Sequence, residues 1–387
     1  NMTNYSSFPA THFDSSSIAG IDESIQFIST VSGSEDLHLS GSSDAIGAGQ
    51  VLTAEYAVDI DGLYRGSVWD IGADQTPATV TKSIGTSGRD YSTMAAWEAD
   101  LDTQGVYANG DSAVGECYND SDFLAGVTIN GGSTVGLAGV TLTAQSGERH
   151  DGTAGTGVRI VSQTNGDGLS GGFSGLTISF IEVDFNSLTN STLYGYGSTY
   201  RGLLMHNGNH RGHVFYYDYS RMNAFNNTVY NMAGSKGLFV IRTTSSQLSY
   251  ISNNTCYNIQ GNSSAYYLRL SNTIGKNNIA VNTSQNGFTY AGSPTVSNNM
   301  SSDGSAASGA DSIINADPNT QFISVVSGSE DLHLAASSDA IKAGVNLGTT
   351  PEGIQYDIDN RARGLVWDIG SDQAVSGHLR RTLLHVG

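Results

Sequence analysis

The sequence predicts an all-β protein built as a parallel β-helix, and three observations favour this fold class. The 387 residues include 48 Gly but only 5 Pro, which suits short strands joined by many tight turns. Asparagine pairs recur at intervals in the twenties beside short apolar stretches. One long segment also occurs twice. With 38% hydrophobic and 14% charged residues, the chain is expected to be folded throughout rather than disordered.

The repeated segment indicates a tandem array. Residues 26–49 match residues 321–344 at 20 of 24 positions, and residues 59–75 match residues 357–373 at 12 of 17 positions. The first residues of the chain also have the register of Asn299 and its successors, 298 positions later. Stacked units of this kind are typical of elongated structural or adhesive proteins.

The repeat suggests a division of the chain. We expect residues 1–80 to be the closing part of a preceding β-helix unit. Residues 81–375 would form a full unit that ends in the repeated closing module, and residues 376–387 would be a C-terminal tail.

A short amphipathic helix is predicted early in the full unit. Met94, Trp97 and Leu101 recur at helical spacing, and Ser92 or Thr93 can cap the N-terminus. Strand-like pieces separated by Gly, Ser, Asn and Asp turns follow in residues 112–160. We expect the helix, through Trp97, to cover one end of the β-helix, where strand edges would otherwise be bare.

The asparagine pairs predict how the coils stack. Their spacings are 27, 24 and 21 residues, and one short strand per period indicates coils about 4.8 Å apart. A period near 24 residues would give roughly twelve coils per unit. The alternative is an antiparallel sandwich or barrel. In the β-helix, the second asparagine of each pair would form a ladder along the axis, made of Asn227, Asn254, Asn278 and Asn299, with Val229, Cys256 and Ala280 facing one way.

The second repeated block combines carboxylates, an arginine and a tryptophan in both copies. We interpret it as an internal ion-pair cap rather than a catalytic group. Asp59 or Asp61 would pair with Arg65, while Trp69 plugs the last coil. The set is repeated by Asp357, Asp359, Arg363 and Trp367.

Charge and cysteine content narrow the possible partners. The net charge of −19 argues against nucleic acid, whose binding depends on cations laid along phosphates. No apolar run approaches the roughly 20 residues needed to span a bilayer. The two cysteines, Cys117 and Cys256, are expected to be buried thiols rather than a disulfide.

Four motifs resemble a known group of proteins: SIGTSGRDYSTMAAWEADL at residues 83–101, GECYND at 115–120, ERHDGTAGTGVRI at 148–160 and the closing SSDAI...AG...DIDN..RG..WDIG. They look like right-handed parallel β-helix proteins of the pectate-lyase-like superfamily. The closing motif resembles the choice-of-anchor regions of phage virion and bacterial surface proteins. The resemblance implies an architecture but not a chemistry, because the fold serves lyases, hydrolases, tailspikes and inert fibres.

By resemblance, a polysaccharide lyase of this fold would use a carboxylate cluster for calcium beside an Arg or Lys, and a hydrolase would present two or three Asp or Glu on adjacent coils. Three or more carboxylates converging in a groove with an Arg or Lys would therefore favour an enzyme. The central coils offer few such groups, the best set being Glu182, Asp184 and Arg211, with Arg201 and His206 nearby. Glu182 and Asp184 have the same parity on a strand, so both are expected to point outward as a solvated face.

Three histidines raise the possibility of a metal site. His206, His210 and His213 are close in sequence, but Gly208 and Gly212 favour a loop in which their spacing fixes no geometry. We therefore expect neither a metal nor a cofactor.

The predicted function is a non-enzymatic structural rod, or a fibre or decoration component, on a virion or cell surface. The alternatives are a carbohydrate-active enzyme, either a polysaccharide lyase or a glycoside hydrolase, and a glycan-binding adhesin. The expected partners are neighbouring copies of the protein or an upstream part of the same polypeptide, together with a surface glycan. An extracellular or virion-surface location follows from this interpretation.

Overall fold

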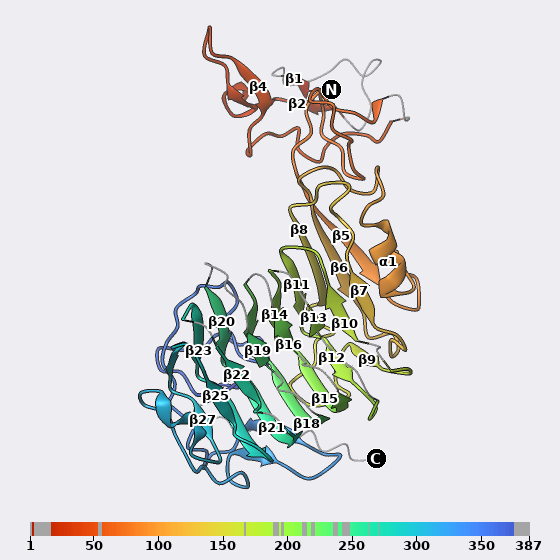
Figure 1. Ribbon diagram of the computed structural model, residues 1–387. Helices are drawn as coiled ribbons and strands as arrows, with labels where there is room; N and C mark the ends of the chain where they lie inside the picture. Colours follow the sequence, from red (N-terminus) through yellow and green to blue (C-terminus); the bar gives the residue numbers. More distant parts are fainter. Residues whose placement is uncertain are drawn as a thin grey trace.

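The computed structural model describes residues 2–3, 17–52, 56–165, 168–188, 193–194, 197–210, 215–217, 221–234, 239–241, 248–262, 264–269 and 271–374. Within them the chain forms a parallel β-solenoid with one short α-helix (Figure 1). Two small modules flank the solenoid in the sequence.

Three parallel sheets run along the solenoid, and successive coils supply their strands. The nine-stranded sheet contains β5 (Thr79–Ile84), β6 (Ser112–Cys117), β8 (Gly139–Ala144), β11 (Leu176–Ser179), β14 (Thr199–Arg201), β17 (Asn223–Phe225), β20 (Ser249–Ser252), β23 (Thr273–Lys276) and β26 (Thr295–Ser297). The seven-stranded sheet contains β9 (Arg159–Val161), β12 (Glu182–Asp184), β15 (Leu204–His210), β18 (Thr228–Gly234), β21 (Thr255–Gly261), β24 (Ile279–Thr283) and β27 (Met300–Ser301). The five-stranded sheet contains β13 (Leu193–Tyr194), β16 (Phe215–Tyr217), β19 (Phe239–Ile241), β22 (Tyr266–Leu268) and β25 (Phe288–Tyr290).

The strand pairing confirms the parallel β-solenoid and excludes the sandwich or barrel. Every pair within these three sheets is parallel, and Val229, Cys256 and Ala280 lie in register on β18, β21 and β24. The longest sheet has nine strands rather than the roughly twelve coils that the repeat length suggested. The number is smaller because the chain leaves the solenoid after the parallel bridges at Ala310 and Ile313 and forms an antiparallel hairpin from Phe322 onward.

Asparagines make four successive corners at which the chain passes from the nine-stranded to the seven-stranded sheet, and Phe180 and Gly202 take the same left-handed position at two earlier corners. Asn226, Asn253, Asn277 and Asn298 have φ angles of 59°, 54°, 57° and 51°. Asparagine enters this left-handed region more readily than most residues because its short side chain can hydrogen bond locally. One such residue per coil therefore fixes the turn and explains the recurring pairs in the sequence.

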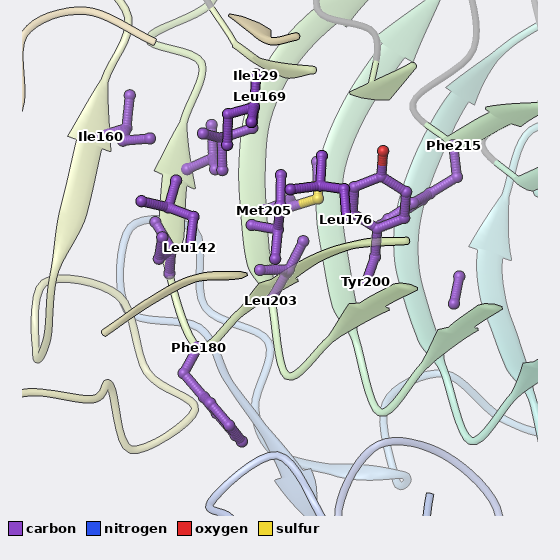
Figure 2. Packing of buried hydrophobic residues seen from close by; sticks show 14 of the residues in the cluster. Ile129, Leu142, Ile160, Leu169, Leu176, Phe180, Tyr200, Leu203, Met205 and Phe215 are labelled. Atoms are coloured by element: carbon purple, nitrogen blue, oxygen red, sulfur yellow. The ribbon is translucent and has the colours of Figure 1, made fainter. Parts of the chain in front are cut away.

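Apolar side chains from all three sheets fill the interior. Figure 2 shows Ile160, Leu176 and Met205 within this core, whereas Phe180 lies apart from the other labelled side chains. Both cysteines belong to the core and are free. Burial raises the pKa of the Cys256 thiol to about 12, so the thiol is unreactive at neutral pH.

An aromatic stack runs along the axis on the inner side of the five-stranded sheet. The ring centroids of Phe215 and Phe239 are 4.5 Å apart, and Tyr266 follows Phe239 at 4.8 Å. Phe288 continues the stack 4.8 Å beyond Tyr266. Each contact of this kind adds about 0.5–1.5 kcal/mol beyond the burial of the rings.

The helix α1 (Met94–Asp100) packs against the first coils, in contact with β5, β6 and β7 (Val127–Ile129). Thr93 caps it by accepting a hydrogen bond from Ala96 N at 3.1 Å. Trp97 is fully buried, and its Nε1 donates to the Tyr107 hydroxyl at 3.0 Å. A short parallel pair, β7 with β10 (Leu169–Gly171), lies nearby.

The two repeated segments share one fold, as predicted. We call residues 17–52 and 56–76 the first module and residues 321–374 the closing module. In the first module β3 (Phe27–Ser29) pairs with β4 (Asp36–Leu39), and in the closing module β28 (Phe322–Ser324) pairs with β29 (Asp331–Leu334). A bridge then joins Gly49 to Trp69 in one copy and Gly344 to Trp367 in the other.

The closing module lies along the side of the solenoid. Figure 1 shows it in blue beside the later coils, while the first module, in red, projects beyond the first coils. Apolar side chains of the module and of the outer face of the seven-stranded sheet form one buried cluster. The module contributes Phe322, Leu332, Leu334, Ala340 and Ile369 to this cluster, and the solenoid contributes Leu204, Tyr230, Tyr257, Ile279, Val281 and Met300. The expectation that the repeated block, through Trp367, plugs the last coil is therefore wrong for the closing module.

The remaining short elements are the 3₁₀ helices η1 (Glu23–Ile25) and η3 (Ser305–Ser308) and the parallel pair of strands β1 (Met2–Thr3) and β2 (Ile18–Ala19). No helix in the described ranges is long and apolar enough to cross a membrane.

The aromatic stack yields a test of the core. Phe239→Ala should lower the free energy of unfolding by about 3–5 kcal/mol, because it opens a cavity between Phe215 and Tyr266. The exposed Leu365 supplies the control, since Leu365→Ala should change stability by less than about 0.5 kcal/mol. Chemical denaturation of both variants measures the difference, and equal losses would contradict the packing described.

Candidate functional site

The second asparagine of each pair forms a buried ladder inside the corner. Asn227 Nδ2 donates to Asn254 Oδ1 at 3.0 Å, and Asn254 Nδ2 donates to Asn278 Oδ1 at 3.0 Å. Asn278 Nδ2 continues to Asn299 Oδ1 at 3.2 Å. The second Nδ2 hydrogen of each side chain goes to a backbone carbonyl, that of Ala224 for Asn254. All four residues are completely buried.

The ladder uses the full hydrogen-bonding capacity of each amide. Asn278 Oδ1 accepts both the side-chain N–H of Asn254 and its backbone N–H, the latter at 3.1 Å. An amide oxygen has two acceptor sites and its nitrogen two hydrogens, so each rung within the ladder is fully paired. A buried corner without these bonds would leave several polar groups unsatisfied in each coil.

The first asparagine of each pair points the other way and binds the closing module. The Nδ2 groups of this outer row donate to module carbonyls: Asn226 to Gly353 at 3.1 Å, Asn253 to Ile354 at 3.1 Å, Asn277 to Val345 at 2.8 Å and Asn298 to Ala343 at 3.0 Å. Val345 N also donates to Asn277 Oδ1 at 2.9 Å. One module thus holds four consecutive coils.

A second row of contacts fastens the module beside the first. The Ser371 hydroxyl lies 2.7 Å from Thr228 Oγ1 and 2.9 Å from Thr255 Oγ1. Gly370 adopts φ +99° here, and a Cβ on it would lie 2.6 Å from Ile279 Cδ1. Ile279 therefore fills the space that this glycine leaves open.

The arginine of the repeated block does not pair with the aspartates as expected. Arg363 donates to the carbonyls of Gly370 at 2.7 Å and Ser371 at 2.9 Å, and Arg65 binds the equivalent carbonyls of Gly72 and Ala73. Its role is to satisfy a tight loop of backbone oxygens. Burial lowers the pKa of Arg363 to about 10, which leaves it charged at neutral pH.

The aspartates and tryptophans of the block have other partners. Asp357 faces Arg361, with Oδ2 3.3 Å from Nε, whereas Asp59 accepts from Asp61 N and Leu63 N in its own turn. Trp367 packs in a buried cluster with Phe225 and Ile354 on the side of the solenoid. Trp69 is also buried, and its Nε1 donates to Gly66 O at 2.8 Å.

The expectation of an exposed carboxylate pair is wrong for Glu182. The parity argument holds, but another loop covers this face: Glu182 is completely buried and its Oε2 accepts from Gly155 N at 2.7 Å. Its Oε1 lies 2.9 Å from His206 Nε2. Asp184 is partly exposed, with Oδ1 3.8 Å from His206 Nδ1.

A groove of about 390 Å³ lies between these strands and the closing module. Its lining includes Asp184, Glu330, Asp331, Arg159 and His206. Three carboxylates and a cation therefore do meet in one groove, which is the arrangement that an enzyme of this fold would require.

These polar groups already have partners within the chain. Arg159 forms a two-pronged pair with Asp122 at 2.9 and 2.8 Å, which raises the pKa of the guanidinium. Glu330 accepts from Asn231 Nδ2 at 2.7 Å, and Asp331 Oδ1 lies 2.5 Å from His333 Nδ1. The groove can accept hydrogen bonds from a polar ligand, but its acids and bases are engaged.

The remaining candidates lie elsewhere. Arg211 and His213 fall outside the described residues, and so does the side chain of His210. Arg201 is half-buried beside the closing module, with its guanidinium 5.4 Å from the ring of Phe180. Burial lowers the pKa of Arg201.

Two equivalent groups of metal-ligating side chains were not anticipated from the sequence. They consist of His38, Asp61 and Asp74 in the first module and of His333, Asp359 and Asp372 in the closing module, with ligand atoms within 4.8 Å of one another. The imidazole and carboxylate donors suit a divalent metal.

The two groups differ in one neighbour. Arg361 contacts Asp359 and lies 3.6 Å from Asp372 in the closing module, whereas Leu63 occupies the equivalent position in the first. The closing-module group is thus an ion-pair cluster. In the first module, Asp36 and Asp61 raise the pKa of the exposed His38 by hydrogen bonding, and two of the three donors are solvent-exposed.

No protein-family model matches the chain, and no curated protein matches it significantly. The likeness to the pectate-lyase-like superfamily therefore rests on the sequence motifs alone.

Sequence reasoning missed the outer asparagine row and the groove. A signal for the row was present, because the asparagines occur as adjacent pairs and a single ladder needs one per coil. The groove could not be predicted from any local sequence pattern, since Asp184 and Glu330 come from segments far apart in the chain.

The ladder predicts a large effect from one substitution. Asn254→Ala should lower the free energy of unfolding by at least about 3 kcal/mol, because it strips partners from buried groups of Asn227, Ala224 and Asn278. Asn319 is an exposed asparagine that bonds locally to Asp317, so Asn319→Ala should cost less than about 0.5 kcal/mol. Chemical denaturation curves measure the free energy of unfolding of both variants. A small loss of stability in Asn254→Ala would contradict a structural role for the ladder.

A second prediction concerns pH. His150 is buried and neutral: its Nε2 lies 2.8 Å from Gly202 O, and Gly152 N donates to its Nδ1 at 3.2 Å. Burial lowers its pKa to about 4, despite opposing attraction from Glu182 and Asp151. Because an unfolded histidine titrates near 6.5, stability is complete above about pH 6.5 and is lost as the pH falls toward 4.

The test compares unfolding at pH 7 and pH 5. The wild-type chain should lose about 2 kcal/mol more than His150→Asn over this interval, because the variant lacks the titrating ring. Parallel losses in the two proteins would show that His150 is not held neutral.

Proposed function

We propose that the chain is a non-enzymatic structural segment of a rod or fibre, or a decoration component, on the surface of a virion or cell. The observation that carries the proposal is continuous bonding along the axis. The asparagine ladder and the aromatic stack both pass through successive coils. Bending the solenoid would strain many of these close-packed contacts together, so the segment is stiff.

The closing module supports the same role. Its four hydrogen bonds to the outer asparagines connect consecutive coils across the side of the solenoid. A force that peels one coil from the next must also displace the module and its apolar cluster. These contacts on the side of the solenoid have no catalytic use, but they make a rod more resistant to mechanical force.

The proposed location rests on the resemblance of the motifs. The closing motif is similar to that of phage virion and bacterial surface proteins, which supports an extracellular or virion-surface location. The net charge of −19 is consistent with it, because a strongly charged surface keeps a long protein soluble.

The groove favours a second candidate function, the binding of a surface glycan. Its volume of about 390 Å³ is at the small end of ligand sites. Asp184 is partly exposed there and can accept bonds from sugar hydroxyls. Cleavage is disfavoured, because Glu182 is buried and committed to His206 and Gly155, whereas a glycosidase needs a free acid paired with a second carboxylate.

The decisive experiment is an assay for unsaturated and reducing ends over a panel of acidic and neutral polysaccharides. The purified chain should release neither, because its buried acid and its histidine are bonded to each other. The exposed Asp317 offers a matched control. Cleavage that is abolished by Asp184→Asn or Glu182→Gln, but retained in Asp317→Asn, would replace the structural proposal with the enzymatic alternative.

A further inference from the structure

One face of the first module is bare, although the same face of the closing module is buried. Leu37 is 62% exposed and its counterpart Leu332 is 4% exposed; for Ile60 and Ile358 the values are 68% and 2%. On the opposite face the copies agree, since Val31 is 67% and Val326 66% exposed. The difference is therefore confined to the face that the closing module turns to the solenoid.

The bare face contains an apolar hollow of about 750 Å³, lined by Phe27, Leu37, Leu39, Ile60 and Ile71 around Gly72. In the closing module Ile279 fills the equivalent space against Gly370, whereas a Cβ on Gly72 would meet nothing within 4 Å. The shape that accepts a solenoid strand is thus present but unfilled.

The strand β1 shows from which side the missing partner comes. Met2 pairs with Ile18 in parallel, as Met300 of β27 pairs with Ile313. The other edge of β27 pairs with β24, through Ile279 and Ala280. Among the described residues β1 has no partner on that edge, so it exposes backbone groups that a solenoid strand would satisfy.

We propose that the first module docks on the side of a solenoid of the same kind that precedes it in the same polypeptide. The flank of this chain's own solenoid is already covered by the closing module, so the occupant is a different solenoid. Its β24-like strand extends β1 and its aliphatic side chain enters the hollow at Gly72. Its outer asparagines bind the carbonyls of Ala48 and Gln50, the counterparts of Ala343 and Val345.

The module is then a joint that fastens one solenoid and leads into the next. Ser67 N donates to Val106 O at 3.1 Å, which ties the first module to the coil that follows it. The inference extends the proposed structural role, but its test measures docking alone. A failed polysaccharide prediction would leave it standing.

The test fuses a second copy of the solenoid to the N-terminus of the whole chain. This added copy consists of residues 77–298 and is joined directly to Asn1. Because Asn1 is the counterpart of Asn299, 298 positions earlier, the junction reproduces the native connection between Asn298 and Asn299. Leu37→Cys provides the probe, since both native cysteines are buried. The rate of its reaction with a soluble maleimide is measured in the extended chain and in the original chain.

Leu37→Cys should react at least about tenfold more slowly in the extended chain, because labelling then requires undocking. Val31→Cys, on the face exposed in both modules, should react equally in the two chains. Ala73→Ser in the extended chain should slow the labelling of Leu37→Cys further, since it restores the hydroxyl by which Ser371 bonds to Thr228 and Thr255.

Three outcomes would overturn the proposal. One is equal labelling of Leu37→Cys in both chains. Another is protection in the original chain that grows with protein concentration, because the occupant would then be a second copy. The third is reaction of Cys117 and Cys256 in the added solenoid, which would show that the first module cannot complete that solenoid as the closing module completes its own.

Discussion

The later coils of the structure depend on satisfying two adjacent amides at each of four successive corners. At Asn226, Asn253 and Asn277 the corner is buried on both sides, inside by the coils and outside by the closing module, so neither amide of these pairs is exposed to water. Because Asn253 adopts the left-handed conformation, its side chain points outward to the closing module, whereas the side chain of Asn254 points along the axis to the next coil. Removing either partner would leave buried polar groups unpaired, at a cost of about 1–3 kcal/mol for each.

This constraint couples the rod to its module. Backbone pairing between strands sets the distance between coils, and the inner ladder and the outer row share that spacing because their members are adjacent residues. Module carbonyls at Ala343, Val345 and Ile354 meet the row at matched intervals. The module therefore recognises a stack of coils rather than any single one, and only a solenoid whose coils are in register can hold it.

The sequence predicts the features that repeat and misses those that depend on distant segments. The period of the asparagine pairs was sufficient for the ladder, because equal spacing along the chain becomes adjacency in a solenoid. The burial of Glu182 was not predictable, since it is covered by Gly155 from another coil. The sequence also could not predict that Leu37 is exposed and Leu332 buried. The two residues lie in identical stretches of sequence, and their exposure depends on which part of the protein packs against them.

The small differences between the modules limit which solenoids they fit. Ser371 shares its hydroxyl with Thr228 and Thr255, and Ala73 has none to share. A threonine pair facing Ala73 would lose those bonds, whereas an apolar pair would not, so the flank suited to the first module carries apolar groups there. Leu63 in place of Arg361 is a further difference, because Arg361 brings a guanidinium to Asp359 and Asp372 and Leu63 brings none to their counterparts Asp61 and Asp74. Units that share one fold are thus kept in order by a few residues at their joints.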